Sequence, residues 1–441
     1  MPAGKRKLKT VPKSNKDEPE IVKKARRVSH PSYESQKNGL VLTMGQGDVG
    51  QLGLGEDVME KKRPAIVTDL EGKDIVQIAC GGMHTVALSS NSELFTWGCN
   101  DEGALGRTTS GENGDEYQPA DIKLPSSSKI VQTSAGDSHT AVLLEDGTVL
   151  AWGTFRDSNG PIGLTPNGQS KEPIKVYPTK ESDDRAVKIT SGNDHVVILT
   201  EGGSIFTFGS GEQGQLGRVK ECFSHRGGRR GISMLLAPQI VRFKKKQRFT
   251  DIFTGSFHTF AVAEEENEVY AWGLNNWGQL GTGDNFNHFA PTMVDSFSDI
   301  RKEQGSAISF AGGQHHSLVL DGKGVVYSVG RAEYGRLGLG DDAKETLEPT
   351  KVHGLVNLQI KQIACGEACS FAVSSGGDLY SWGLGSNLQL GIGDEDDVLV
   401  ATQVKSKNLD PSKHEVISVS SGGQHTAMLV KERLKAPNGN V

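Results

Sequence analysis

The stretch IVQIACGGMHTVALSSNSELFTWGCNDEGALG, residues 75–106, contains the pattern that decides the fold. Short runs of β-branched, aromatic and other apolar residues alternate in it with Gly, Ser, Asn and Asp. This alternation is typical of antiparallel strands joined by tight turns, and it is not the periodicity of a helix. A further short run at residues 120–124 comes before the pattern starts again. The unit therefore predicts a sheet of about four strands.

Two signatures of this unit recur along the chain. The first is Gly-x-x-His, with Cys once in place of His, and successive copies are 54 to 63 residues apart. Its last residues are His84, His139, His195, His258, His315, Cys369 and His425. The second is an apolar residue followed by glycine, which ends at Gly45, Gly98, Gly153, Gly209, Gly273, Gly330 and Gly383. Seven four-stranded repeats that cannot each bury a core predict a propeller.

The two signatures are out of phase at the chain ends. Gly45 has no Gly-x-x-His strand before it, and His425 has no Trp-Gly strand after it. Pairing residues 416–429 with residues 40–67 would complete one more blade and leave no raw sheet edge. We therefore expect an all-β, seven-bladed propeller over residues 39–430, with a closing blade shared by the N- and C-terminal segments.

Residues 1–38 form a basic segment attached to an acidic body. They contain eleven Lys or Arg and four Asp or Glu, whereas the whole chain has a net charge of -6. Their composition, rich in Pro, Ser and Asn, predicts disorder. Two dense basic clusters favour a bipartite nuclear import signal or a nucleic-acid contact over a merely solubilising tail. They are formed by Lys5, Arg6 and Lys7, and by Lys23, Lys24, Arg26 and Arg27. Residues 431–441 are expected to form a C-terminal tail.

Several other classes of protein are disfavoured. No apolar run approaches the roughly eighteen residues of a membrane helix, and the basic N-terminus lacks the apolar core of a secretory signal. Five cysteines, an odd and sparse set, indicate no disulfide framework and suit a reducing compartment. The repeated histidines are spread around a ring, so they predict hydrogen bonds within or between blades and no metal site. We expect a soluble protein without a metal or cofactor.

Two irregular features stand out from the repeat. The longest interval contains a Gly-rich loop with Arg226, Arg229 and Arg230, which is either a contact surface or simply solvated. In the other feature, Asp194 is the only charge among the residues that precede the repeat His or Cys. We expect a turn to present it at a rim of the disc. The loops after the apolar-Gly strands add further acidic residues, among them Asp48 and Asp157, and the blade of Asp157 lacks the usual Gly-x-Leu-Gly.

These residues resemble one known family. The Gly-x-x-His-Thr repeat, the seven copies, the split closing blade and the stretches GQGDVGQLGLGE, CNDEGALGR, SGNDH, GEQGQLGR and GRAEYGRLGLG resemble the regulator of chromosome condensation family. The resemblance covers the whole propeller. It implies a nuclear, chromatin-associated factor that exchanges guanine nucleotide on the small GTPase Ran at one face of the disc and binds nucleosomes at the other.

The resemblance also implies roles for particular residues. The GTPase-binding positions are Asp48, Asp157, Asp194, Arg218, His315 and His425. A wedge directed at the nucleotide site comprises the segment from Lys175 to Asp184, with Tyr177, Pro178, Thr179 and Lys180. Arg226 and Arg229 match a loop that meets the histone acidic patch, with Arg230 as a basic neighbour. DNA and a nuclear import receptor are the expected partners of the N-terminal clusters, and no membrane is expected.

Two other functions remain open from the residues alone. A propeller scaffold that bridges chromatin and protein partners would show the same repeat and would differ only in its rim loops. A hydrolytic or metal enzyme would need convergent carboxylates or histidines outside the repeat, and the adjacent pair His315 and His316 is the nearest candidate.

Overall fold

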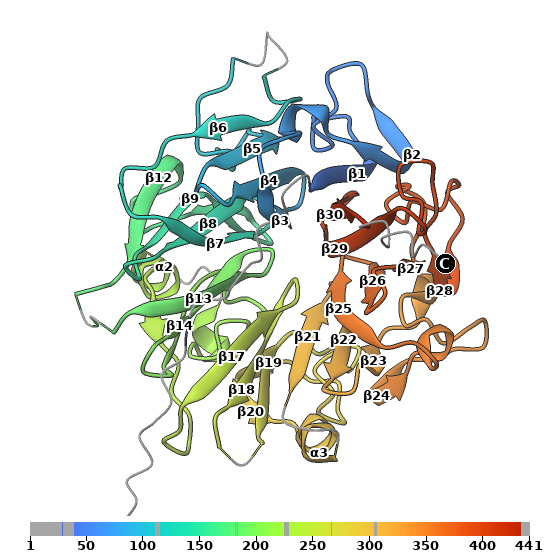
Figure 1. The fold of residues 1–441 in the computed structure, drawn as a ribbon. Helices are drawn as coiled ribbons and strands as arrows, with labels where there is room; N and C mark the ends of the chain where they lie inside the picture. The colour runs from blue at the N-terminus through green and yellow to red at the C-terminus, as the bar shows by residue number, and fades with distance from the viewer. Residues whose placement is uncertain are drawn as a thin grey trace, which may run out of the picture.

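The structure, a computed structural model, describes residues 29, 39–110, 115–180, 182, 184–224, 229–265, 267–303 and 307–433. Seven four-stranded antiparallel sheets surround a central axis, as Figure 1 shows. The predicted seven-bladed propeller is therefore confirmed. The predicted N-terminal segment, apart from Ser29, and residues 434–441 lie outside the described residues.

Each blade runs from an innermost first strand to an outermost fourth strand. In this order the blades are β3 (Ile75–Cys80), β4 (His84–Ser89), β5 (Leu94–Gly98), β6 (Ala120–Ile122); β7 (Ile130–Ala135), β8 (His139–Leu144), β9 (Val149–Gly153), β12 (Ser170–Tyr177); β13 (Ala186–Ser191), β14 (His195–Thr200), β15 (Ile205–Gly209), β16 (Gln239–Ile240); β17 (Phe249–Thr254), β18 (His258–Ala263), β19 (Val269–Gly273), β20 (His288–Met293); β21 (Ile308–Gly312), β22 (His316–Asp321), β23 (Val326–Gly330), β24 (Thr346–Lys351); β25 (Ile360–Cys365), β26 (Cys369–Ser374), β27 (Leu379–Gly383), β28 (Val398–Gln403); and β29 (His414–Ser421), β30 (His425–Glu432), β1 (Leu40–Gln46), β2 (Glu60–Ile66). Insertions add β10 (Phe155–Asp157), β11 (Gly160–Gly163), α1 (Glu221–Ser224), α2 (Arg229–Leu236) and α3 (Asp295–Glu303), and three short 3-10 turns are η1 (Thr68–Leu70), η2 (Glu333–Gly335) and η3 (His353–Leu355).

The closing blade joins the two ends of the chain as predicted. β1 pairs antiparallel with β30, so that Leu42 lies opposite Met428 and Gly45 opposite His425. Figure 1 shows the blue β1 beside the red β30. This pairing closes the ring, because it gives the last blade four strands like the other six and joins the N-terminal β1 to the C-terminal β30.

Buried histidines link neighbouring blades. In five of the six, the ring nitrogen Nε2 is hydrogen-bonded to a Thr or Ser hydroxyl of the next blade, in the pairs His84–Thr140, His195–Thr259, His258–Ser317, His316–Ser370 and His425–Thr85. The distances are 2.7 to 3.0 Å. His139 makes no such bond in the described part of the chain, because Val196 stands where the hydroxyl would be. The structural interpretation of the repeat histidines is confirmed.

One register in the sequence prediction was wrong. The buried position in the fifth blade is occupied by His316 and not by His315, because β22 begins at His316. The Gly-x-x-His signature there starts at Gly313, and Ser317 supplies the hydroxyl. His315 therefore precedes the repeat histidine, which is the same position that Asp194 has in its own blade. The pair His315 and His316 is thus one surface residue and one core residue.

Successive strands of a blade run in opposite directions, so the connections between them fall at two distinct ends of the disc. We call the loop end the one that carries the turns between first and second strands and the loops between third and fourth strands. Backbone hydrogen bonds join these two sets, for example from Ser210 N to the Asp194 carbonyl at 2.7 Å and from Arg331 N to the His315 carbonyl at 2.9 Å. The turn end carries the remaining turns and the blade-to-blade connections. Because β1 starts and β30 finishes at the turn end, both chain termini leave the propeller there.

Candidate functional site

Asp194 lies at the loop end, in the turn between β13 and β14. It is 8% exposed, and its Oδ1 accepts a hydrogen bond from the Arg156 backbone N–H at 2.7 Å. Burial, together with the negative charge of Asp137, raises the pKa of Asp194 to about 8. The expectation that Asp194 projects from the rim was wrong, because the carboxyl is used to hold the neighbouring blade's insertion.

That insertion is the hairpin of β10 and β11, which replaces the Gly-x-Leu-Gly turn between β9 and β12. Arg156 forms an ion pair with Glu102 at 2.9 Å on one side, and Ser158 donates to Glu212 at 2.7 Å on the other. The hairpin is thus attached to both flanking blades. Asp157 lies at its end, partly exposed, and accepts a hydrogen bond from Asn159 N. Sequence reasoning missed the hairpin, although the missing Gly-x-Leu-Gly was a signal for it.

His315 is the second polar group at this position of the repeat. It is partly exposed, and its Nδ1 has no hydrogen-bond partner among the described residues. Burial, with the positive charges of Arg336 and Arg331, lowers the pKa of His315 to about 4. At neutral pH it is therefore an uncharged imidazole that can accept or donate a hydrogen bond.

Further acidic groups gather at the loop end. Asp48 is exposed in the loop between β1 and β2, where it accepts a hydrogen bond from Gln51. Two acids that sequence reasoning missed, Asp137 and Glu367, lie in the turns around the mouth of a central channel of about 350 Å³. Burial, then the charge of Asp137, raises the pKa of Glu367. Clustered carboxylates at a concave mouth attract a cationic surface.

Two predicted contact residues have their polar groups engaged within the propeller. His425 is 0% exposed and bonded to Thr85, so it is a core residue and cannot touch a partner directly. Arg218 donates to the backbone carbonyls of Thr207, Met234, Leu235 and Ala237, at 2.8 to 3.2 Å. Burial lowers the pKa of Arg218 to about 10. Its guanidinium holds the loop between β15 and β16 in place.

The predicted wedge is at the wrong end of the disc. Lys175 and Tyr177 belong to β12, whose Tyr177 lies opposite Val149 at the turn end. Tyr177 is buried, while Pro178 and Thr179 are partly buried and Lys180 is exposed. Asp184 accepts a hydrogen bond from Gly202 N in a turn of the same end. This segment is separated by the length of a blade from Asp48, Asp157 and Asp194, so it cannot act beside them.

The arginine loop belongs to the connection between β15 and β16. Arg226 lies outside the described residues, and Arg229 and Arg230 begin α2. Leu235 and Leu236 at the other end of α2 are buried against the blade. This connection leaves the propeller at the loop end, after β15, and returns to it at β16. The expectation that the arginine loop and the GTPase-binding residues lie on opposite faces stays a prediction.

A second basic segment lies at the turn end. The connection between β16 and β17 contains Lys244, Lys245 and Lys246, which are exposed, followed by Arg248. The chain termini leave the propeller at this same end. The basic clusters at residues 5–7 and 23–27 lie outside the described residues.

The raised pKa of Asp194 predicts a pH-dependent stability. A carboxyl whose pKa is higher in the folded state stabilises the fold at low pH, and this contribution is lost as pH rises from about 4 to about 8. The Asp194→Asn variant should therefore show a smaller decrease in unfolding free energy between pH 5 and pH 8 than the wild type. Urea unfolding at both pH values measures it, with Asp48→Asn, exposed at the same end, as control. Equal pH slopes for wild type and Asp194→Asn would contradict the assignment.

The described residues contain neither a group of three or more His, Cys, Asp and Glu arranged to hold a metal ion nor a helix long and apolar enough to cross a membrane. Their five cysteines are all free thiols. Cys369 is buried at the position that histidine has in the other blades.

Comparison with known proteins identifies close relatives. Residues 40–428 match the family model of the RCC1-like domain. The chain is 52% identical to the regulator of chromosome condensation of Xenopus laevis, over 92% of this chain and 93% of the relative. It is 34% identical to the guanine nucleotide exchange factor SRM1 of Saccharomyces cerevisiae, over 87% and 86%.

Solved structures agree with these relatives. Prp20p of Saccharomyces cerevisiae, described with its binding to Gsp1p and histones, superposes with a TM-score of 0.81 at 32% identity, over 91% of this chain and 94% of the other. Yeast Prp20 in complex with Kap60 gives a TM-score of 0.82 at 31% identity, over 98% and 97%.

Proposed function

The chain belongs to the regulator of chromosome condensation family, and from this premise we propose that it is a guanine nucleotide exchange factor for the small GTPase Ran. The relative SRM1 is named a guanine nucleotide exchange factor. The observation that carries the proposal is the acidic loop end, where Asp48 is exposed, Asp157 is partly exposed and the buried Asp194 holds the hairpin that carries Asp157.

Exchange of this kind needs no covalent chemistry. A protein that binds the nucleotide-free GTPase more tightly than the loaded one weakens nucleotide binding by the same factor, because coupling between two sites is reciprocal. Lowering the affinity of the GTPase for its nucleotide by about five decades requires about 7 kcal/mol of differential binding, at about 1.4 kcal/mol per decade. The protein must therefore make contacts that the nucleotide-bound GTPase does not offer.

The loop end supplies groups suited to this task. Its carboxylates accept hydrogen bonds from basic side chains and backbone amides, which are the groups that hold phosphate in a loaded GTPase. Neutral His315, two blades away from that of Asp194, adds a hydrogen-bonding group without adding charge. In place of the segment 175–184, we assign the displacing role to the hairpin of β10 and β11, because its tip at Ser158 and Asn159 is exposed beside Asp194.

Release of labelled nucleotide from purified Ran tests this function. The full-length protein at catalytic concentration should accelerate release of labelled GDP by several orders of magnitude. A scaffold propeller, the alternative function, would bind partners and leave the release rate at its intrinsic value. Without acceleration the exchange proposal fails and the scaffold remains.

We also propose that the protein binds nucleosomes in the nucleus. Arginine's planar group suits the carboxylates of a histone acidic patch, so we assign Arg226 and Arg229 to histones, with Arg230 beside them. Lys244, Lys245, Lys246 and the N-terminal clusters are assigned to DNA, since all of them are at or attached to the turn end. The same N-terminal clusters would bind an import receptor, in keeping with the Kap60 complex of yeast Prp20.

Two changes should separate the histone and DNA contacts. Arg226→Ala combined with Arg229→Ala should weaken nucleosome binding about tenfold or more and leave free-DNA binding nearly unchanged, because only the histone contact is lost. Deleting residues 2–27 should reduce DNA affinity and flatten its salt dependence, because the shortened protein contacts fewer phosphates and so releases fewer counterions on binding. Gel-shift titrations at several salt concentrations measure both. Lys171→Ala with Lys344→Ala, both exposed at the loop end, controls for general loss of charge, and an equal effect of this pair would reject the division.

A further inference from the structure

A groove at the outer part of the loop end plays no part in the contacts assigned so far. It has a volume of about 380 Å³ and is lined by Trp277, Arg331, Glu333, Tyr334, Asp341 and Glu345, with Leu399 at its side. These residues come from three consecutive blades. The groove is separate from the mouth of the central channel, whose lining shares no residue with it.

The groove has an unbalanced negative charge. Glu333 is paired with Arg331, and its Oε2 also lies 3.9 Å from Arg336. Asp341 and Glu345 are exposed, and neither forms an ion pair within the described part of the chain. Two carboxylates are therefore left to attract a cation from outside.

Two arginine side chains of the protein already lie against the aromatic walls of the groove. The Arg331 guanidinium lies 4.5 Å above the centre of the Trp277 ring, and that of Arg336 lies 5.2 Å from the centre of Tyr334. Tyr334 nevertheless remains 41% exposed. An exposed aromatic ring beside free carboxylates is a favourable place for a further ammonium or guanidinium group.

Tyr334 has an unusual backbone that presents its side chain. Its φ is +61°, in the left-handed region. The equivalent residues of the other regular loops, Val49, Glu102, Gln213, Trp277 and Asn387, do not have positive φ. Such a conformation costs a bulky residue about 1–3 kcal/mol and is concentrated at sites that bind ligands. Leu388 in the equivalent loop of the next blade also has a φ of +61°, but one position later. Strain at the position of Tyr334 itself accords with a role for its ring.

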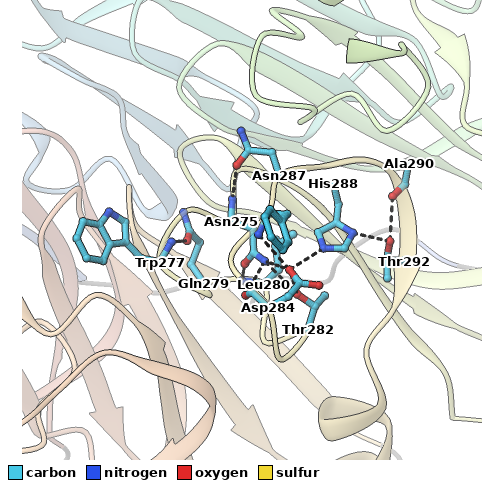
Figure 2. A network of polar contacts seen from close by, with 11 residues as sticks. Asn275, Trp277, Gln279, Leu280, Thr282, Asp284, Asn287, His288, Ala290 and Thr292 are labelled. Carbon is cyan, nitrogen blue, oxygen red and sulfur yellow. Dashed lines mark hydrogen bonds and ion pairs between the residues drawn. The ribbon is translucent and has the colours of Figure 1, made fainter.

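The opposite wall of the groove, Trp277, belongs to a loop that is held by several hydrogen bonds. Its backbone N–H donates to Gln279 at 3.0 Å, and the loop behind it is tied by Asp284, which accepts from Asn275 at 2.8 Å and lies 3.1 Å from His288. Figure 2 shows the indole of Trp277 at the edge of this network, pointing away from Asp284 and His288. Although burial opposes it, the hydrogen bond with His288 lowers the pKa of Asp284.

We propose that this groove binds a lysine or arginine side chain of the GTPase and so contributes to docking away from the nucleotide site. The two free carboxylates neutralise the cation, Tyr334 covers it, and Leu399 contacts its aliphatic stem. The inference rests on the proposed exchange function. It assigns to the groove affinity for the GTPase, whereas Asp194 and His315 act on nucleotide release itself.

The repeat offers a matched control for the charge of the groove. The loop Gly53 to Glu60 of the closing blade aligns with Gly338 to Glu345, so that Glu56 matches Asp341 and Glu60 matches Glu345. Gly55 N donates to the Tyr117 carbonyl as Gly340 N does to that of Leu399. Val49 stands there in place of Tyr334, and Asn387 of the preceding blade in place of Trp277, so the equivalent loop has acids at the same two positions but lacks these two aromatic walls, with Tyr117 in the place of Leu399.

Steady-state exchange on purified Ran, at varied Ran concentration and with the full-length protein, tests the proposal. Asp341→Asn with Glu345→Gln, and separately Tyr334→Asn, should each raise KM about three- to thirtyfold and leave kcat within about twofold. Asparagine is chosen because it tolerates positive φ. The control, Glu56→Gln with Glu60→Gln, should change KM by less than about twofold.

Several outcomes would overturn the groove's role. An unchanged KM in both groove variants, or an equal rise in the control, would do so. Absence of any exchange by the wild type would instead refute the proposed function, so the two failures are distinguishable. A photo-crosslinker at position 399, Leu399→p-benzoylphenylalanine, identifies the occupant. An adduct on a lysine- or arginine-containing peptide of Ran supports the proposal, and an adduct on residues 1–38 of this chain or on a histone overturns it.

Discussion

Asp194→Asn is expected to slow nucleotide release from Ran by about threefold to several hundredfold. Asp194 is largely protonated in the free protein at neutral pH, because its pKa is about 8, and it would ionise when a basic group of the GTPase pairs with it. Truncating one member of a buried, hydrogen-bonded charge pair at an interface costs about 2–5 kcal/mol, and deprotonating Asp194 at pH 7 offsets about 1.4 kcal/mol of this, which is one decade. Asparagine keeps an oxygen that can accept the Arg156 N–H at the distance of 2.7 Å seen for the aspartate. The hairpin of β10 and β11 should therefore stay in place, and the loss should be one of charge and not of structure.

Stopped-flow release of labelled GDP measures this effect. Met83→Ala is the control, because Met83 has the same position in the first blade, is 40% exposed and carries no polar group. It should change the rate by less than about threefold. His315→Ala should act in the same direction as Asp194→Asn, since it removes a neutral hydrogen-bonding group. Unchanged release in both Asp194→Asn and His315→Ala would exclude these residues from the site.

Met428→Asp is expected to prevent stable folding of the whole propeller. Met428 is 0% exposed in β30, opposite Leu42 of β1, and its side chain belongs to the core of the closing blade. An unpaired carboxylate in an apolar core costs several kcal/mol, which is a large part of the roughly 5–15 kcal/mol that stabilises a domain. Because β30 is bonded to strands from both chain ends, its loss would open the ring.

Thermal unfolding followed by circular dichroism checks this second effect. The melting temperature should fall by more than about 10 °C, or no cooperative transition should remain. Val400→Asp, which places the same charge on the outer strand β28 where Val400 is 39% exposed, should lower it by only a few degrees. Similar small shifts in both variants would show that closure between β1 and β30 does not hold the propeller together.

The repeat made the fold predictable, whereas the site was predicted only in part. Asp48, Asp157, Asp194 and His315 all lie at the loop end, because each occupies a repeat position whose end of the blade follows from strand order. His425 was misplaced because a residue that matches a surface position by motif can be a core residue by packing. The acids Asp137 and Glu367 were missed, since in one dimension neither is near Asp194.

The sequence by itself determined the number of blades, their four strands and the shared closing blade, because turn glycines and alternating apolar residues act locally and recur at a nearly constant interval. Only the tertiary structure decided which irregular residues meet. It buries Asp194 beneath the hairpin of β10 and β11, moves the segment 175–184 to the turn end, and forms one groove from three blades. Contacts between blades depend on side chains more than fifty residues apart, and their burial and charge exist only once the ring is closed.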